Sequence, residues 1–139
     1  MNGAVLDASV FVAAVSPREI HHCAARELYD SYAADRAFLV PSLFRLEVLA
    51  ALARRGESDE LLDNIDVLVT GPRFHSVPID ASLLERSVQV ARTGHLRAYD
   101  AVYVALALSL DASFLTLDAD VRSKVAEVFP SLSLVVAVE

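Results

Sequence analysis

The most apolar stretch of the chain, residues 98–117, limits the possible folds more than any other feature. It is long enough for a membrane helix, or it divides into a buried helix and a buried strand of a soluble domain. Asp100 and Asp111 lie within it, and each would cost about 2.5–3.5 kcal/mol near the centre of a bilayer. The sequence therefore predicts a buried helix over 97–110, a buried strand over 114–117 and no membrane span.

Short apolar runs alternate with helical patterns along the whole chain. The runs predict strands at 4–6, 38–40, 74–79, 114–117 and 132–138. The helical patterns cover 8–15, 20–34, 41–55, 58–69, 80–92 and 97–110, with a last helix that begins at Asp118 or Asp120 and ends near Val128. This alternation is typical of an α/β fold, in which a central, mostly parallel sheet of about five strands carries helices on both faces.

Length and composition predict one domain over residues 1–139. The chain is 55% hydrophobic, with no internal repeat, linker or composition break, and it has the size of one typical domain. Cys23 is its single cysteine, which excludes an internal disulfide and a cysteine-rich zinc site. Residues 1–3 carry no Lys or Arg and do not resemble a signal peptide, so we expect a cytoplasmic protein.

Two acidic residues lie on apolar helix faces. The neighbours of Glu47 three and four positions away are all apolar, and Asp100 has mostly apolar neighbours at the same spacing. An unpaired buried carboxylate costs several kcal/mol, so each of these acids is expected to have a cationic or hydrogen-bonding partner, or a function that offsets the cost. Glu47 could pair with an arginine of another helix, and Asp100 could cap a helix that starts later than predicted.

Two further acids, Asp7 and Asp118, directly follow predicted strands and precede predicted helices. The carboxyl ends of parallel strands lie at one sheet edge, where ligands bind. The simpler alternative is that each acid is a helix N-cap, a position that Asp favours. Ser9 and Thr116 lie two residues away, and their hydroxyls could orient a carboxylate or a metal-bound water, or form ordinary hydrogen bonds at the ends of a helix and a strand.

Together the four acids favour a metal site. Carboxylates brought together raise one another's pKa unless a cation joins them. Oxygen ligands suit a hard divalent ion such as Mg²⁺ or Mn²⁺, which can activate water and stabilise the charge on a phosphodiester. The net charge of −7 argues against a general nucleic-acid coat but is compatible with a nuclease whose site is acidic.

The segments that carry these acids resemble the PIN domain, and within it the small VapC-type toxins of toxin–antitoxin pairs. The resemblance rests on four segments in order: 5–9 (VLDAS), 41–48 (PSLFRLEV), 99–107 (YDAVYVALA) and 114–118 (FLTLD). It implies a metal-dependent endoribonuclease that holds Mg²⁺ or Mn²⁺ on an acidic quartet of catalytic residues, and it covers nearly the whole chain. The quartet consists of Asp7, Glu47, Asp100 and Asp118, with Ser9 and Thr116 at the accompanying hydroxyl positions and Asp120 as a possible substitute for Asp118. Ala8 departs from the hydroxyl residue that many members carry.

The resemblance also implies partners: an RNA substrate, a cognate antitoxin protein and a second copy of the chain. The predicted helices over 20–34 and 58–69 could form partner surfaces, or their apolar faces could simply face the core. Weaker candidates for RNA contacts are arginines near the predicted site, namely Arg54, Arg55, Arg92 and Arg97. Arg54 and Arg55 could equally stabilise a helix C-terminus.

Two rival functions remain. The first is a binding or regulatory module that keeps the fold and the acids with weak catalysis or none. The second is a Mg²⁺-dependent phosphatase or phosphotransfer domain, which also uses an aspartate at a strand end. The segment Asp7-Ala8-Ser9 lacks the second aspartate of one such enzyme class, and Lys124 lies in a predicted helix rather than at the strand end that another requires.

Overall fold

The computed structural model describes residues 3–136 and has seven helices and five strands in that part of the chain. In chain order these are β1 (Ala4–Leu6), α1 (Ala8–Val15), α2 (His22–Ala33), β2 (Phe38–Pro41), α3 (Phe44–Arg54), α4 (Asp59–Val69), β3 (Phe74–Val77), α5 (Ala81–Gly94), α6 (Ala98–Ser109), β4 (Ser113–Thr116), α7 (Ala119–Val128) and β5 (Leu134–Val136). The predicted α/β fold is confirmed. The predicted end of the last strand, 137–138, and both ends of the predicted domain lie outside the described residues.

All five strands are parallel, in the order β3-β2-β1-β4-β5. The chain leaves β1 toward β2 on one side, whereas β4 and β5 extend the sheet on the other side. The connections therefore diverge at the carboxyl ends of β1 and β4, which is where ligands bind in sheets of this type. All three residues of β1 are fully buried, as expected for a strand that helices cover on both faces.

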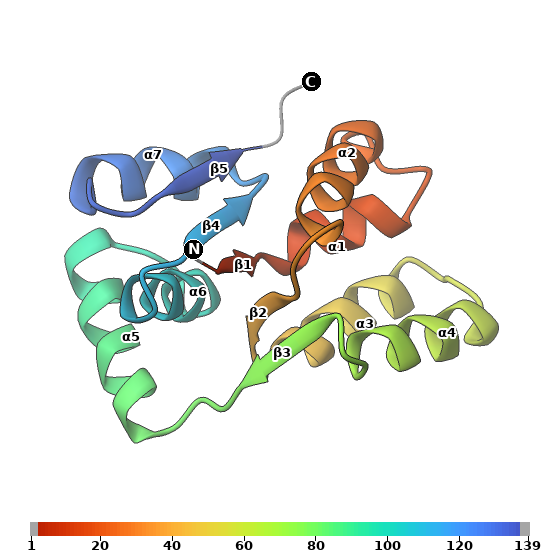
Figure 1. Cartoon of the computed structure of the whole chain (residues 1–139), viewed down its shortest axis with the longest axis horizontal. Coiled ribbons are helices and arrows are strands. Elements are labelled where there is room, and N and C mark those ends of the chain that lie inside the picture. Colours follow the sequence, from red (N-terminus) through yellow and green to blue (C-terminus); the bar gives the residue numbers. More distant parts are fainter. Residues whose placement is uncertain (1–2, 137–139) are drawn as a thin grey trace.

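Helices cover the two sides of the sheet. Figure 1 shows α1 and α6 on opposite sides of the central strand β1. On the α1 side, the Phe11 ring contacts the rings of Tyr29, Phe44 and Phe74, with centroids 5.3–5.8 Å apart. These contacts fix α1 against α2, α3 and β3. The position of α3, which carries one of the predicted acids, therefore depends on an aromatic cluster.

Helix α6 is the buried helix that the apolar stretch predicts. Every residue from 101 to 107 is buried, and the ring of Tyr103 stacks on Phe114 of β4 with centroids 6.3 Å apart. Among residues 3–136, no helix has the length and hydropathy needed to cross a membrane.

Several predicted element boundaries are wrong: the helix expected from 20 begins at His22, the strand expected to reach 79 ends at Val77, and the strand expected from 132 begins at Leu134. For α3 and α5 the contacts give the reason. The helix expected from Pro41 begins at Phe44, because Pro41 continues β2 and pairs with Val77 of β3. Helix α5 was expected to end near Arg92, with Gly94 as the terminator. It continues through Gly94, and the residue with a left-handed backbone is His95 (φ 55°). Gly94 is instead needed for packing, because a Cβ there would come within 2.9 Å of the Phe129 ring.

Candidate active site

Asp7 and Asp118 follow the adjacent strands β1 and β4, at one and two residues past their ends, and are N-caps of the helices that come next. The Asp7 carboxylate accepts a hydrogen bond from the Ser9 amide at 3.3 Å. Oδ1 of Asp118 accepts hydrogen bonds from the amides of Asp120 and Val121 at 2.9 and 3.2 Å. The capping interpretation is therefore correct for both acids. Both side chains also line one cleft, so capping and a place in a site coexist.

Asp7 is the most buried of the four acids, with 8% of its surface exposed. Its Oδ2 accepts hydrogen bonds from Oγ of Ser9 at 3.0 Å and from Oγ1 of Thr116 at 2.8 Å. Thr116 is fully buried, and its hydroxyl also accepts a hydrogen bond from the Asp118 amide at 3.1 Å. Burial nevertheless raises the pKa of Asp7, because desolvation outweighs these bonds, and the charge of Asp100 raises it further.

Glu47 projects from the first turn of α3 and is half-buried. Its Oε1 accepts a hydrogen bond from the Tyr103 hydroxyl of α6 at 2.7 Å. Burial raises the pKa of Glu47 from 4.5 to about 7; the Tyr103 bond opposes the rise, and the charges of Asp7 and Asp100 add to it. Within residues 3–136 Glu47 forms no ion pair, so the alternative of an arginine partner is wrong.

Asp100 and Asp118 share one arginine. Nε of Arg97 donates to Oδ2 of Asp100 at 3.2 Å, and its Nη2 donates to Oδ2 of Asp118 at 3.1 Å. Arg97 is the N-cap residue of α6, so the alternative that Asp100 caps this helix is wrong. Burial raises the pKa of Asp100 although Arg97 lowers it, and the charge of Asp118 adds to the rise.

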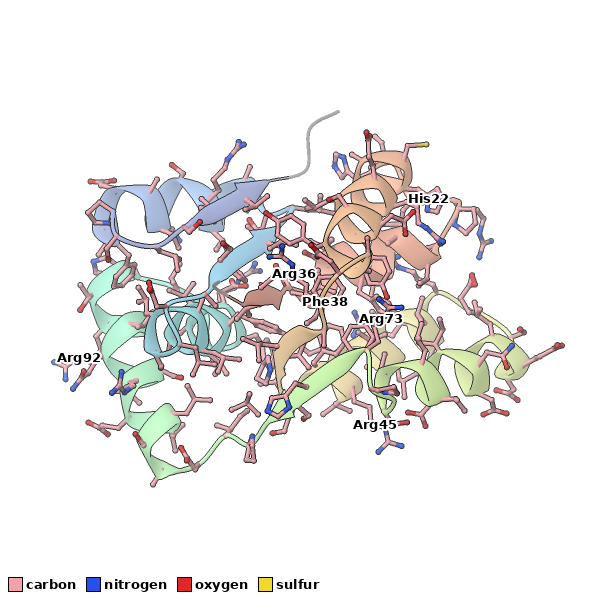
Figure 2. All side chains as sticks on the ribbon, viewed as in Figure 1. His22, Arg36, Phe38, Arg45, Arg73 and Arg92 are labelled. Carbon is pink, nitrogen blue, oxygen red and sulfur yellow. The ribbon has the colours of Figure 1, made fainter. Side chains whose placement is uncertain are left out.

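The four predicted acids line a single cleft of about 890 Å³, together with Ser9, Arg54, Arg55 and Arg97. Other predicted residues lie elsewhere. Asp120 is exposed and pairs with Lys124 at 3.1 Å, and Figure 2 shows Arg92 on the outer side of α5. Glu19, Leu46 and Tyr99 also line this cleft, although no sequence pattern indicated them; Glu19 pairs with Arg55 at 3.2 Å.

The acids converge on the cleft without forming a tight cluster. Within residues 3–136, no three acidic, histidine or cysteine side chains are close enough to hold one ion together. Arg97 draws Asp100 and Asp118 to itself, whereas hydroxyl and amide donors hold Asp7 and Glu47. The arrangement leaves excess negative charge in a partly buried cleft, which is a site for a cationic group.

The stability of the metal-free protein is expected to fall as the pH rises from about 4.5 through 7. Glu47 has a higher pKa when folded, about 7, than its ordinary 4.5, so the folded state binds more protons in this range and loses stability as they leave. The melting temperature in EDTA should be higher at pH 5 than at pH 8. Glu47→Gln should flatten this dependence, whereas Glu85→Gln on the exposed face of α5 should not. If the melting temperatures of wild type and Glu47→Gln changed with pH in parallel, Glu47 would not be the group that causes the dependence.

Comparison with known proteins relates the whole arrangement to one family. The sequence profile of the PIN domain matches residues 4–127. No curated protein matches the chain. Among solved structures, a toxin–antitoxin complex from Klebsiella pneumoniae matches with a TM-score of 0.74 and 16% identity over 96% of both chains.

Two further structures have the same fold. The VapC20 toxin of Mycobacterium tuberculosis, described as cleaving the sarcin–ricin loop, matches with a TM-score of 0.75 and 16% identity over 87% of this chain and 94% of that one. The VapBC2 complex of Rickettsia felis, bound to a DNA fragment of its promoter, matches with a TM-score of 0.67 and 12% identity over 97% and 98%. The TM-scores of these three structures establish a shared fold, and identities of 12–16% show the fold alone.

Proposed function

The chain belongs to the PIN domain family, and on that basis we propose that it is a metal-dependent endoribonuclease, the toxin of a toxin–antitoxin pair. Similar solved structures include a toxin described as cleaving the sarcin–ricin loop and a toxin–antitoxin complex. These descriptions concern proteins of the same fold, and they support the proposal together with the cleft of this chain.

The observation that carries the proposal is the convergence of Asp7, Glu47 and Asp100 from three separate elements on one cleft. The charge of Asp100 acts on Asp7, and the charges of Asp7 and Asp100 act on Glu47. Placing such acids together lowers the free energy of unfolding, and perturbed groups of this kind are typical of functional sites.

The donor atoms fit a hard divalent cation. All three acids offer carboxylate oxygens, and neither Asp7 nor Glu47 forms an ion pair within residues 3–136. In the structure of residues 3–136 these acids are too far apart to share one ion. We infer that Asp7, Glu47 and Asp100 would draw together around Mg²⁺ or Mn²⁺, with support from Asp118. When bound, such an ion activates water and stabilises the developing charge of a phosphodiester.

Other residues in and beside the cleft orient the acidic side chains or would bind the RNA. The hydroxyls of Ser9 and Thr116 fix the Asp7 carboxylate by donating to its Oδ2. Arg97 fixes Asp118 relative to Asp100. Arg54 and Arg55, at the end of α3, place cationic groups on the cleft wall, where they would contact backbone phosphates of the RNA.

The direct test is cleavage of a mixed RNA substrate by purified protein with Mg²⁺ or Mn²⁺, and with EDTA. We expect cleavage with either ion and none after chelation, with recovery when the ion is added back. Metal-dependent RNA binding without cleavage would replace the nuclease by the binding-module alternative. Cleavage that EDTA leaves unchanged would contradict the proposed role of the ion.

Arg54→Ala is expected to raise the KM for RNA with kcat unchanged, because it removes one phosphate contact away from the acids. The dependence of log K on log salt concentration should fall by about 1 for such a contact. Arg92→Ala is the matched control, since Arg92 lies on the outer side of α5 (Figure 2) and should leave KM unchanged. Equal effects of the two substitutions would mean that Arg54 has no specific role.

We also propose an antitoxin protein and a second copy of this chain as partners. Complexes of similar fold contain an antitoxin, and large apolar side chains are exposed on α4 and α5, among them Val67 (75%) and Leu84 (55%). Exposed apolar surface favours association. Sedimentation equilibrium tests the second copy, and co-purification with the product of an adjacent gene tests the antitoxin. A monomer at all concentrations would exclude the dimer.

A further inference from the structure

Tyr103 is a buried phenol that no part of the proposed mechanism uses so far. Its side chain belongs to α6 and is fully buried. Its hydroxyl donates to Oε1 of Glu47 at 2.7 Å and so links two helices at residues 56 positions apart. The other buried residues of α6 between 101 and 107 are alanine, valine and leucine.

Packing alone does not explain the hydroxyl. A phenylalanine ring would make the same stacking contact with Phe114 and would avoid the burial of a polar group. A phenol is protonated at neutral pH and a carboxylate only accepts, so in the 2.7 Å contact Tyr103 is the donor. The role of the hydroxyl is therefore its hydrogen bond to the carboxylate of Glu47.

We propose that Tyr103 is a positioning residue that holds the Glu47 carboxylate toward the cleft for cation binding. The hydrogen bond engages Oε1 and would leave Oε2 of the same carboxylate available to a cation. The ring is fixed between the sheet and α6, so it limits the rotation of a glutamate side chain that would otherwise sample several rotamers. Outer partners of this kind orient metal ligands, and their loss typically costs about 10–100-fold in metal affinity.

This inference rests on the proposed metal-binding role of Glu47, and a double-mutant cycle tests it. The Mg²⁺ affinities of wild type, Tyr103→Phe, Glu47→Gln and the double variant are measured by titration calorimetry. We expect Tyr103→Phe to weaken binding about 10-fold and to have no further effect in the Glu47→Gln background, because the hydroxyl acts through Glu47. Tyr29→Phe is the matched control: Tyr29 packs on Phe11 and Phe38 away from the cleft, so the affinity should not change.

The outcomes separate the two proposals. If wild type binds Mg²⁺ and Tyr103→Phe binds it equally well, or loses the same factor in both backgrounds, Tyr103 has no positioning role and the metal site stands. If wild type binds no Mg²⁺, both proposals fail.

A measurement on the wild type does not depend on how the variants fold. The chain has four tyrosines, so its ¹³Cζ-tyrosine NMR spectrum is simple, and a soluble paramagnetic agent will not broaden the signal of the fully buried Tyr103. We expect this protected signal to shift on Mg²⁺ saturation. A signal that stays fixed through saturation overturns the inference.

Discussion

Asparagine in place of Asp100 is expected to reduce metal-dependent RNA cleavage about 10³-fold, which corresponds to about 4 kcal/mol of lost transition-state stabilisation. The substitution removes one anionic oxygen donor from the cleft and keeps the size of the side chain. Arg97 keeps its second partner, Asp118, so the start of α6 should keep its conformation. The measurement is kcat/KM on a labelled RNA, with circular dichroism to verify folding.

Asp63→Asn is the control for Asp100→Asn. Asp63 lies on the exposed face of α4 and outside the cleft, so the same change of charge there should leave kcat/KM unchanged. If Asp100→Asn is folded and cleaves as fast as wild type, Asp100 is not a catalytic residue. If both variants lose activity equally, the loss reflects net charge and not the site.

Asparagine in place of Asp7 is expected to act in opposite directions on activity and stability. Cleavage should again fall about 10³-fold, because Asp7 is the acid that both hydroxyls orient. The melting temperature of the metal-free protein at pH 8 should rise by about 4 °C, the shift that ~1 kcal/mol gives a domain of this size. The reason is that burial raises the pKa of Asp7, so its charge costs folding energy, whereas asparagine caps a helix as well as aspartate does.

Asp80→Asn is the matched control for this pair of effects. Asp80 caps α5 by accepting a hydrogen bond from the Leu83 amide at 2.8 Å, and it lies outside the cleft. The same substitution at this cap should change neither stability nor cleavage. A fall in the melting temperature of metal-free Asp7→Asn would contradict the account, because it would mean that the ionised Asp7 stabilises the fold.

The strand-end acids could be placed from the sequence because a parallel sheet brings the carboxyl ends of its strands to one edge. Asp7 and Asp118 are joined in this way through Thr116, whose hydroxyl donates to one and accepts from the amide of the other. The apolar neighbours of Glu47 and Asp100 correctly indicated that these acids face inward. The sequence pattern was sufficient for these four acids, because each prediction needed only the type of one helix or strand and the direction in which the chain runs through it.

Contacts between distant elements could not be predicted in this way. The bond from Tyr103 to Glu47 depends on how α6 and α3 pack, and helical periodicity alone gives no information about that. Arg92 and Arg97 are close in sequence, but the left-handed turn at His95 separates their helices, and only Arg97 reaches the cleft. The start of α3 was misplaced because Pro41 pairs with β3, a contact that its own segment does not reveal.

The proposed metal site can be tested directly by locating a bound Mn²⁺ ion through its anomalous scattering in crystals of the wild-type protein. We expect one strong peak in the cleft, next to carboxylate oxygens of Asp7, Glu47 and Asp100, and no such peak in crystals of Asp7→Asn. A cleft without a peak at saturating Mn²⁺, or ions bound only at other surface carboxylates, would contradict the proposed site.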